Sequence, residues 1–107
     1  MAYSKMTEDI IAVIRSIPPG YVSSYGVIAQ VAGYGNGARQ VVRILSTLSD
    51  KENLPWHRVV NKQGKIMLRD EGECEQILLL EREGVHFTLE GIVDSTYFYD
   101  FTSKSHP

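Results

Sequence analysis

Apolar residues recur at helical spacing near the start of the chain. Between residues 10 and 17 they fall on one helical face, at Ile10, Ile11, Val13, Ile14 and Ile17. Such a stripe predicts an amphipathic helix with one buried side. Thr7 can cap this helix, the acidic pair Glu8-Asp9 suits its first turn, and Pro18-Pro19-Gly20 ends it. We assign the helix to the core and give it no chemical role.

Two shorter helices are predicted next, from about residue 25 to 31 and from about residue 38 to 48. Ser23 or Ser24 can cap the first, whose apolar positions are Val27, Ile28 and Val31. The segment 33–37 contains three glycines and predicts a turn. The second helix directs inward Val41, Val42, Leu45 and Leu48. Two short helices joined by a glycine-bearing turn, after a leading helix, are typical of a helix-turn-helix.

The pattern after residue 53 predicts short strands and one more helix. Val59-Val60 and Lys65 to Leu68 read as two strands of a small hairpin, or wing, joined by a turn at 61–65. A fourth helix is expected from Glu73 to Glu83, closed by Gly84. Its expected buried positions are Ile77, Leu78, Leu79 and Leu80.

The C-terminal part alternates loosely and then becomes aromatic. Residues 85–93 predict a second hairpin through Glu90-Gly91, and the rings after residue 94 are expected to cover the core. We therefore predict a mainly α fold with small β-hairpins, similar to a winged helix-turn-helix. It forms one domain over residues 1–107, with a core at about 5–93, a tail at 94–107 and a frayed end from residue 103.

Composition restricts the class of protein. Apolar residues make up 43% and charged residues 22% of the chain, as in soluble globular proteins. No apolar run approaches the ~20 residues of a membrane span, and early charged residues argue against a signal peptide. Cys74 is the single cysteine, so we expect neither an intrachain disulfide nor a cysteine metal cluster. These features predict a cytoplasmic protein.

Charge is distributed unevenly along the chain. Residues 10–69 hold eight Lys/Arg and two acidic residues, a net of +6, whereas residues 70–107 hold two Lys/Arg and nine acidic residues, a net of −7. The total of −2 is a weak argument against nucleic acid, but the basic segment predicts a one-sided positive face. The alternative is that folding interleaves the two segments and cancels the asymmetry.

The third predicted helix carries its positive charge at its start. Arg39 lies in the first turn and Arg43 one turn later, and no acidic residue occurs between Ile10 and Ser49. An arginine in a first turn opposes the helix dipole, so it gains nothing locally. The small Ala38 beside it allows close approach to a partner. We favour a helix pressed into a DNA groove over a solvated arginine, because Tyr25 and the serines before it also offer phosphate contacts at a helix start.

The chain's single tryptophan lies in the stretch Pro55-Trp56-His57-Arg58-Val59-Val60. Proline fixes the backbone and removes an N–H donor, so the stretch presents Trp56 and His57 rigidly outside a helix. One interpretation is a core tryptophan beside a structural histidine. The other is a functional site, which the surrounding sequence must support.

Four separated blocks of the sequence occur in a recognisable order. They are Ser24-Tyr25-Gly26-Val27-Ile28-Ala29, Ala38-Arg39-Gln40-Val41-Val42, Pro55-Trp56-His57-Arg58-Val59 and Glu83-Gly84. Their order and the spacing from Arg39 to Trp56 resemble the DNA-binding domain of the O6-alkylguanine-DNA alkyltransferases, over roughly residues 5–90. In that family the third block reads Pro-Cys-His-Arg-Val, and its cysteine accepts the alkyl group. Tryptophan in its place is similar to the narrower group of alkyltransferase-like proteins.

The resemblance implies how the chain meets double-stranded DNA containing O6-alkylguanine. The helix-turn-helix would enter the minor groove. Arg39 matches the finger that fills the gap left by an extruded nucleotide, and Tyr25 matches the tyrosine that presses on the neighbouring phosphate. Ser24, Ala38 and Arg43 are expected to contact DNA beside them.

The resemblance also implies a pocket for the extruded guanine. The expected pocket residues are Pro55, Trp56, His57, Arg58, Val59, Arg69 and Asp70. Arg69 stands where the transferases carry a pocket tyrosine, and backbone carbonyls near Trp56 and Val59 would accept from the guanine amino group. His57 and Glu83 match the family's proton-handling pair.

The sequence lacks an alkyl acceptor at the expected place. Transfer to protein requires a thiolate, and Trp56 offers only an indole N–H and an apolar face. Cys74 lies in a predicted helix between two glutamates, which disfavour a thiolate. The resemblance therefore implies a non-catalytic damage sensor, without metal or cofactor, that flips O6-alkylguanine and recruits nucleotide excision repair proteins. Such a protein would associate with the nucleoid when bound to DNA.

Two other functions stay open at this point. His57 with Glu83 could activate water and hydrolyse an alkyl–oxygen or glycosidic bond. The chain could also be a winged helix-turn-helix transcription factor, although Arg39, Gln40 and Arg43 give few groups for reading bases in the major groove.

Overall fold

The computed structural model describes residues 3–68 and 70–102. Four helices dominate it: α1 (Lys5–Ser16), α2 (Tyr25–Val31), α3 (Ala38–Glu52) and α4 (Glu71–Arg82). Two-residue strands β1 (Ser23–Ser24) and β2 (Val59–Val60) form one small sheet, and short 3-10 turns occur at Trp56–Arg58 and Ser95–Tyr97. The predicted mainly α fold is confirmed. None of the described helices is both long and apolar enough to cross a membrane.

Helix ends follow side-chain caps. Ser4, not Thr7, caps α1, because its hydroxyl accepts the Thr7 N–H at 3.2 Å and starts the helix a turn earlier. Ser24 caps α2 by accepting the Val27 N–H at 3.2 Å. Helix α3 runs past the predicted end at residue 48 and stops at Asn53, which adopts a left-handed φ of 51°.

The strand pairing differs from the predicted wing. Strand β2 pairs in parallel with β1, in the register Ser23 to Val59 and Ser24 to Val60. The turn after β2 does form, because the Asn61 side chain accepts the N–H groups of Gln63 and Lys65. Residues 65–68 nevertheless form no strand. The partner of β2 lies far upstream in the sequence, which a local pattern cannot reveal.

The second predicted hairpin is reduced to a single antiparallel bridge between Phe87 and Val93. The turn at 61–64 packs against this bridge through Gly64, whose carbonyl accepts the Val93 N–H at 2.9 Å. Gly64 has a φ of +86°, and a Cβ there would lie 2.5 Å from the Val93 carbonyl oxygen. Glycine is therefore required where the turn meets the C-terminal segment.

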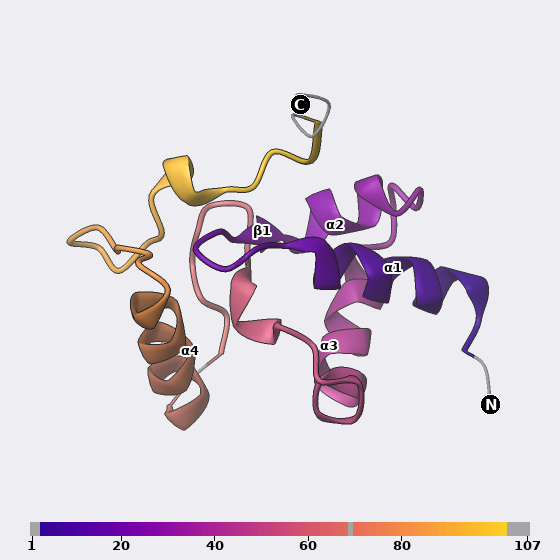
Figure 1. The fold of residues 1–107 in the computed structure, drawn as a ribbon, viewed down its shortest axis with the longest axis horizontal. Coiled ribbons are helices and arrows are strands. Elements are labelled where there is room, and N and C mark those ends of the chain that lie inside the picture. The colour runs from indigo at the N-terminus through magenta and orange to yellow at the C-terminus, as the bar shows by residue number, and fades with distance from the viewer. Residues whose placement is uncertain (1–2, 69, 103–107) are drawn as a thin grey trace.

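Two clusters of buried side chains form the core. The first joins α1, α2 and α3 and includes Ile10, Ile14, Ile28, Val41 and Ile44. The second lies between β2, α4 and the C-terminal segment and contains Val22, Val60, Leu80, Val85 and Val93. In Figure 1, α1, α2 and α3 gather on one side and α4 lies on the other, with residues 55–68 between them.

Some predictions of which helix side chains are buried were wrong. Val42 is 48% exposed and Leu78 is 55% exposed, whereas Ile44 and Gln76 are buried. Two apolar positions of α2, Val27 and Val31, are also exposed. Neighbouring apolar residues on a helix cannot all share one face, and the tertiary contacts decide which of them is covered.

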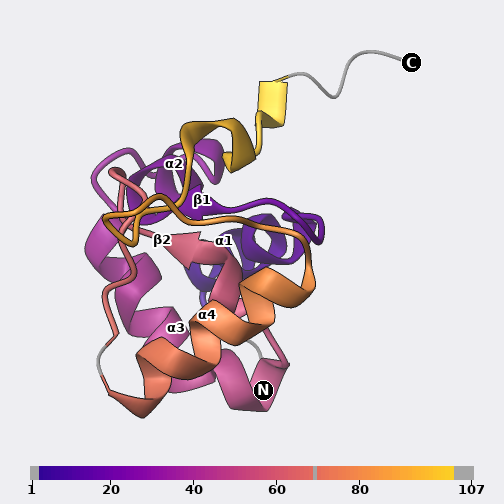
Figure 2. The same ribbon diagram turned by 90° about the vertical axis from the view of Figure 1, so that its left-hand side faces the viewer.

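The aromatic tail covers the core, as expected. Phe98 packs against the second cluster and Phe101 against the first. The tail also forms backbone bonds that the sequence did not indicate: Val22 donates to the Tyr97 carbonyl at 2.9 Å and accepts from Tyr99 at 2.8 Å. Figure 2 shows this segment running along β1, away from α3.

Candidate nucleic-acid interface

The Pro55–Val60 stretch is a 3-10 turn leading into β2. Trp56 donates its backbone N–H to the Leu54 carbonyl at 2.8 Å, and Arg58 donates to the Pro55 carbonyl at 3.0 Å. The turn has no side-chain cap. Its position therefore depends on contacts made by the side chains and carbonyls of the turn itself.

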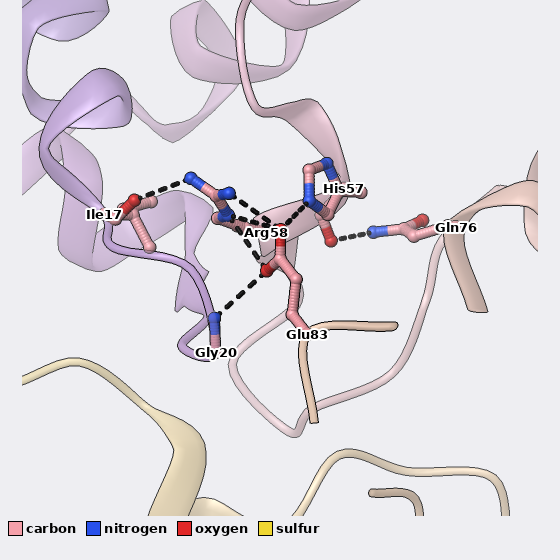
Figure 3. Close-up of polar contacts among 6 residues, drawn as sticks. All are labelled: Ile17, Gly20, His57, Arg58, Gln76 and Glu83. Carbon is pink, nitrogen blue, oxygen red and sulfur yellow. Dashed lines mark hydrogen bonds and ion pairs between the residues drawn. The ribbon is translucent and has the colours of Figure 1, made fainter. Parts of the chain in front are cut away.

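An ion-pair network holds the turn from one side (Figure 3). Arg58 donates to both oxygens of the Glu83 carboxylate, with the shortest contact at 2.7 Å, and to the Ile17 carbonyl at 3.0 Å. His57 Nε2 lies 2.8 Å from Glu83 Oε2, and the Gly20 N–H donates to Oε1 at 3.1 Å. Glu83 thus connects the end of α4, the turn and the loop after α1.

The same network fixes the charge of Glu83. Burial raises the pKa of this carboxyl, but hydrogen bonds from Arg58, His57 and the Gly20 N–H outweigh burial and lower the pKa to about 2. Glu83 is therefore a permanently ionised acceptor at neutral pH. Such a carboxylate orients His57 and pairs with Arg58, but it is a poor base for activating water.

A buried glutamine holds the turn from the other side. Gln76, on the inner face of α4, is 2% exposed. Its Nε2 donates to the carbonyls of His57 and Val59, each at 3.0 Å. Sequence reasoning missed Gln76 because it looked for apolar residues. The available signal was its place one turn before the buried Leu80, on the same helical face.

A pocket of about 430 Å³ lies between α3, α4 and the turn. Three of the expected site residues, Tyr25, Trp56 and Val59, line this pocket. The other lining residues are Val42, Leu45, Ser46, Thr47, Ser49, Asp50, Leu68, Gly72, Glu75 and Gln76. This volume suits a small-molecule or base-sized ligand. Burial raises the pKa of the Tyr25 phenol, so its hydroxyl is neutral.

The remaining residues expected at the pocket lie elsewhere. Pro55, His57, Arg58 and Asp70 are outside its lining. His57 and Arg58 face Glu83 instead, and Asp70 is exposed at the start of α4 with a φ of 57°. Arg69 lies outside the described residues.

Helix α3 presents its arginines to solvent. Arg39 and Arg43 are exposed, and within the described part of the chain neither makes an ion pair. Ala38 is half-buried at the helix start, which Gly37 precedes without a side-chain cap. Because Val42, Leu45 and Ser46 line the pocket, one helix carries both the free arginines and a pocket wall.

Ser24 is buried, whereas Arg39 and Arg43 are exposed to solvent. Its side chain is buried, with the residue 2% exposed, and its hydroxyl is used to cap α2. Ser24 therefore fixes the start of the helix that carries Tyr25, while its own hydroxyl lies away from solvent.

Fold and site together define a small helix-turn-helix domain with a lateral pocket. The chain belongs to the family of the 6-O-methylguanine DNA methyltransferase DNA-binding domain, whose profile matches residues 5–85. The resemblance seen in the sequence is thereby confirmed.

Curated relatives support the same assignment. A DNA base-flipping protein of Vibrio parahaemolyticus is 49% identical over 77 residues, which cover 72% of this chain and 77% of that protein. Alkyltransferase-like protein 1 of Schizosaccharomyces pombe is 46% identical over 74 residues, covering 67% of this chain and 68% of the relative. The Escherichia coli DNA base-flipping protein is 42% identical over 82 residues, covering 77% of this chain and 64% of that protein.

Solved structures share the fold. S. pombe Atl1 in complex with damaged DNA containing O6-carboxymethylguanine superimposes with a TM-score of 0.76 and 34% identity, over 94% of this chain and 99% of that one. The Mycobacterium tuberculosis O6-methylguanine methyltransferase matches with a TM-score of 0.58 and 27% identity, over 77% of this chain and 50% of that chain.

Proposed function

We propose that this chain binds O6-alkylguanine in duplex DNA, rotates the damaged nucleotide into the pocket and holds it there without removing the alkyl group. One observation carries the proposal: the pocket of about 430 Å³ borders Tyr25 and Trp56 and shares helix α3 with two free arginines. A relative of the same fold was solved with DNA carrying an O6-alkylated guanine.

Each DNA-facing residue has a role that fits its exposure and chemistry. Extruding a base costs a few kcal/mol of unstacking, which an inserted side chain and pocket contacts must offset. We assign the insertion to Arg39, since a planar, weakly hydrated guanidinium can stack in the vacated space. Tyr25 would press on the neighbouring phosphate, and Arg43 would contact the backbone as α3 enters the minor groove. The half-buried Ala38 would leave room for close approach.

The proposal excludes alkyl transfer because no cysteine thiol occurs among the described residues that line the pocket. Trp56 supplies an indole N–H and a ring face. Cys74 is exposed on α4 and does not line the pocket. We infer that the held lesion then recruits nucleotide excision repair proteins, an inference that rests on the resemblance to alkyltransferase-like proteins.

A binding titration tests the proposal directly. Purified protein should bind a duplex containing O6-methylguanine more tightly than its unmodified twin, and base analysis of the recovered DNA should return all of the methyl group. Equal affinity for the two duplexes, or loss of methyl, would overturn it.

Variants test the interface. Arg39→Ala should weaken binding to the O6-methylguanine duplex, because it removes the group that fills the vacated stack. Arg82→Ala, which removes an exposed arginine at the far end of α4, serves as the matched control. Equal losses for the two variants would indicate general charge attraction rather than insertion.

A further inference from the structure

The side-chain amide of Gln76 has one free end. Both hydrogens of Nε2 face carbonyls, at 3.0 Å each, so the opposite atom must be the oxygen. This Oε1 accepts no hydrogen bond from the described residues. It is nevertheless not fully enclosed, because among these residues Ser23 Oγ is the one fully enclosed polar side-chain atom without a partner. Oε1 therefore retains contact with open space, and the open space that Gln76 borders is the pocket.

The hydroxyls of α3 that line the pocket are already used as donors. Ser46 donates to the Val42 carbonyl at 3.0 Å, Thr47 to the Arg43 carbonyl at 2.7 Å, and Ser49 to the Leu45 carbonyl at 2.6 Å. A hydroxyl has one hydrogen. Toward the pocket these three groups can therefore only accept.

Two carboxylates add further acceptors to the lining. Asp50 near the end of α3 and Glu75 on α4 both line the pocket and are exposed. Neither side chain makes an ion pair or hydrogen bond with the residues described. An ionised carboxylate only accepts. On the described lining, the side chains that can still donate are those of Tyr25, through its hydroxyl, and Trp56, through its indole N–H.

We propose that the acceptors of Gln76, Asp50, Glu75 and the three hydroxyls, together called the acceptor wall although they come from both α3 and α4, select among O6-alkylguanines by the chemistry of their substituents. A substituent that brings an N–H, an O–H or a positive charge finds acceptors there. A substituent that ends in a carboxylate finds no donor on the wall and meets two like charges. This inference rests on the proposed binding of O6-alkylguanine in the pocket and adds a preference for cationic or hydrogen-bond-donating adducts over anionic ones.

The test uses four duplexes that differ only at one O6 substituent: methyl, n-propyl, 2-aminoethyl and carboxymethyl. The propyl group is the neutral, apolar match in size for aminoethyl and is one heavy atom smaller than carboxymethyl. Fluorescence anisotropy with the full chain should give tighter binding of aminoethyl than of propyl, and weaker binding of carboxymethyl. The exposed carboxylates of Asp50 and Glu75 attract the aminoethyl group and repel the carboxymethyl group, and these two effects together should separate the two affinities by about tenfold. The O6-carboxymethyl adduct, bound by the S. pombe relative, should be the weakest ligand of the series.

Charge-neutralising variants assign the effect to the wall. Asp50→Asn and Glu75→Gln keep the side-chain size and should each reduce the aminoethyl-to-carboxymethyl affinity ratio, with the double variant bringing it close to one. Glu73→Gln removes an exposed charge from the same helix outside the pocket lining and should leave the ratio unchanged.

The outcomes separate this inference from the proposed function. Suppose that the protein prefers O6-methylguanine over guanine but binds the propyl, aminoethyl and carboxymethyl duplexes equally well. This result would overturn the proposed selectivity and leave the proposed function standing. Equal binding of methylated and unmodified duplexes would overturn the function itself. If the aminoethyl-to-carboxymethyl affinity ratio falls equally in Glu73→Gln and Glu75→Gln, the selectivity comes from long-range charge and not from contact with the pocket lining, which would also overturn the inference.

Discussion

Replacing Glu83 by glutamine should destabilise the fold in a pH-dependent way. The carboxylate receives two side chains of the 55–60 turn and a backbone N–H from the loop after α1. Glutamine keeps the shape and one acceptor oxygen but removes the charge that faces Arg58. The Arg58 side chain is 15% exposed, so its charge would lose its partner in a poorly solvated place.

The pKa of Glu83 gives the size of this effect. Its decrease from 4.5 to about 2 corresponds to about 3 kcal/mol if fully realised. The Glu83 side chain retains 16% exposure, and solvent screening brings the expected value to about 2 kcal/mol. Because the folded-state pKa is the lower one, the contribution is complete above about pH 4.5 and is lost as the pH falls through 2. Roughly 60% of it is gone by pH 3.

The prediction is tested by urea denaturation at several pH values between 7 and 3. Unfolding is monitored through the fluorescence of Trp56 and through circular dichroism. The difference in unfolding free energy between the natural chain and Glu83→Gln should shrink by more than half over this range. Asp9, Glu52 and Asp94 also have lowered pKa values, but they are common to both proteins and cancel in the difference. Glu81→Gln, on the exposed side of the same helix, is the control. A difference that stays constant from pH 7 to pH 3 would refute the reasoning.

Three further predictions concern single positions. Gly64→Ala should cost about 3 kcal/mol in urea denaturation, because it combines a positive φ with a backbone clash, whereas Gly91→Ala has positive φ and open space and should cost about 1 kcal/mol; equal costs would contradict the clash. Gln76→Leu should lower the free energy of unfolding by about 2–4 kcal/mol, because it leaves two backbone carbonyls without their donor; thermal denaturation showing no loss would contradict this role. Ser24→Ala should cost about 1 kcal/mol and speed hydrogen exchange at the start of α2; unchanged exchange there would show that the cap is dispensable.

The local pattern was sufficient for the helices and for the family. Apolar spacing predicted the ends of α1, α3 and α4 to within a few residues and gave the observed bounds of α2. This is possible because the hydrogen bonds of a helix are local. The order of the sequence blocks pointed to the alkyltransferase DNA-binding domain, which the family match confirms. Trp56 could be singled out for the same reason, since it stands in a block whose other members are typical of that family.

Long-range contacts decided the rest. The partner of β2 is β1, and the tail pairs with Val22, because strand pairing depends on which distant segments the core brings together. His57 and Arg58 looked like pocket residues but face Glu83, while Gln76, a polar residue in an apolar helix face, holds the turn from the other side. The sequence alone determined which segments fold as helices and which family they form. The tertiary structure decided which side chains reach the pocket, because burial and pairing are set by neighbours far apart in the chain.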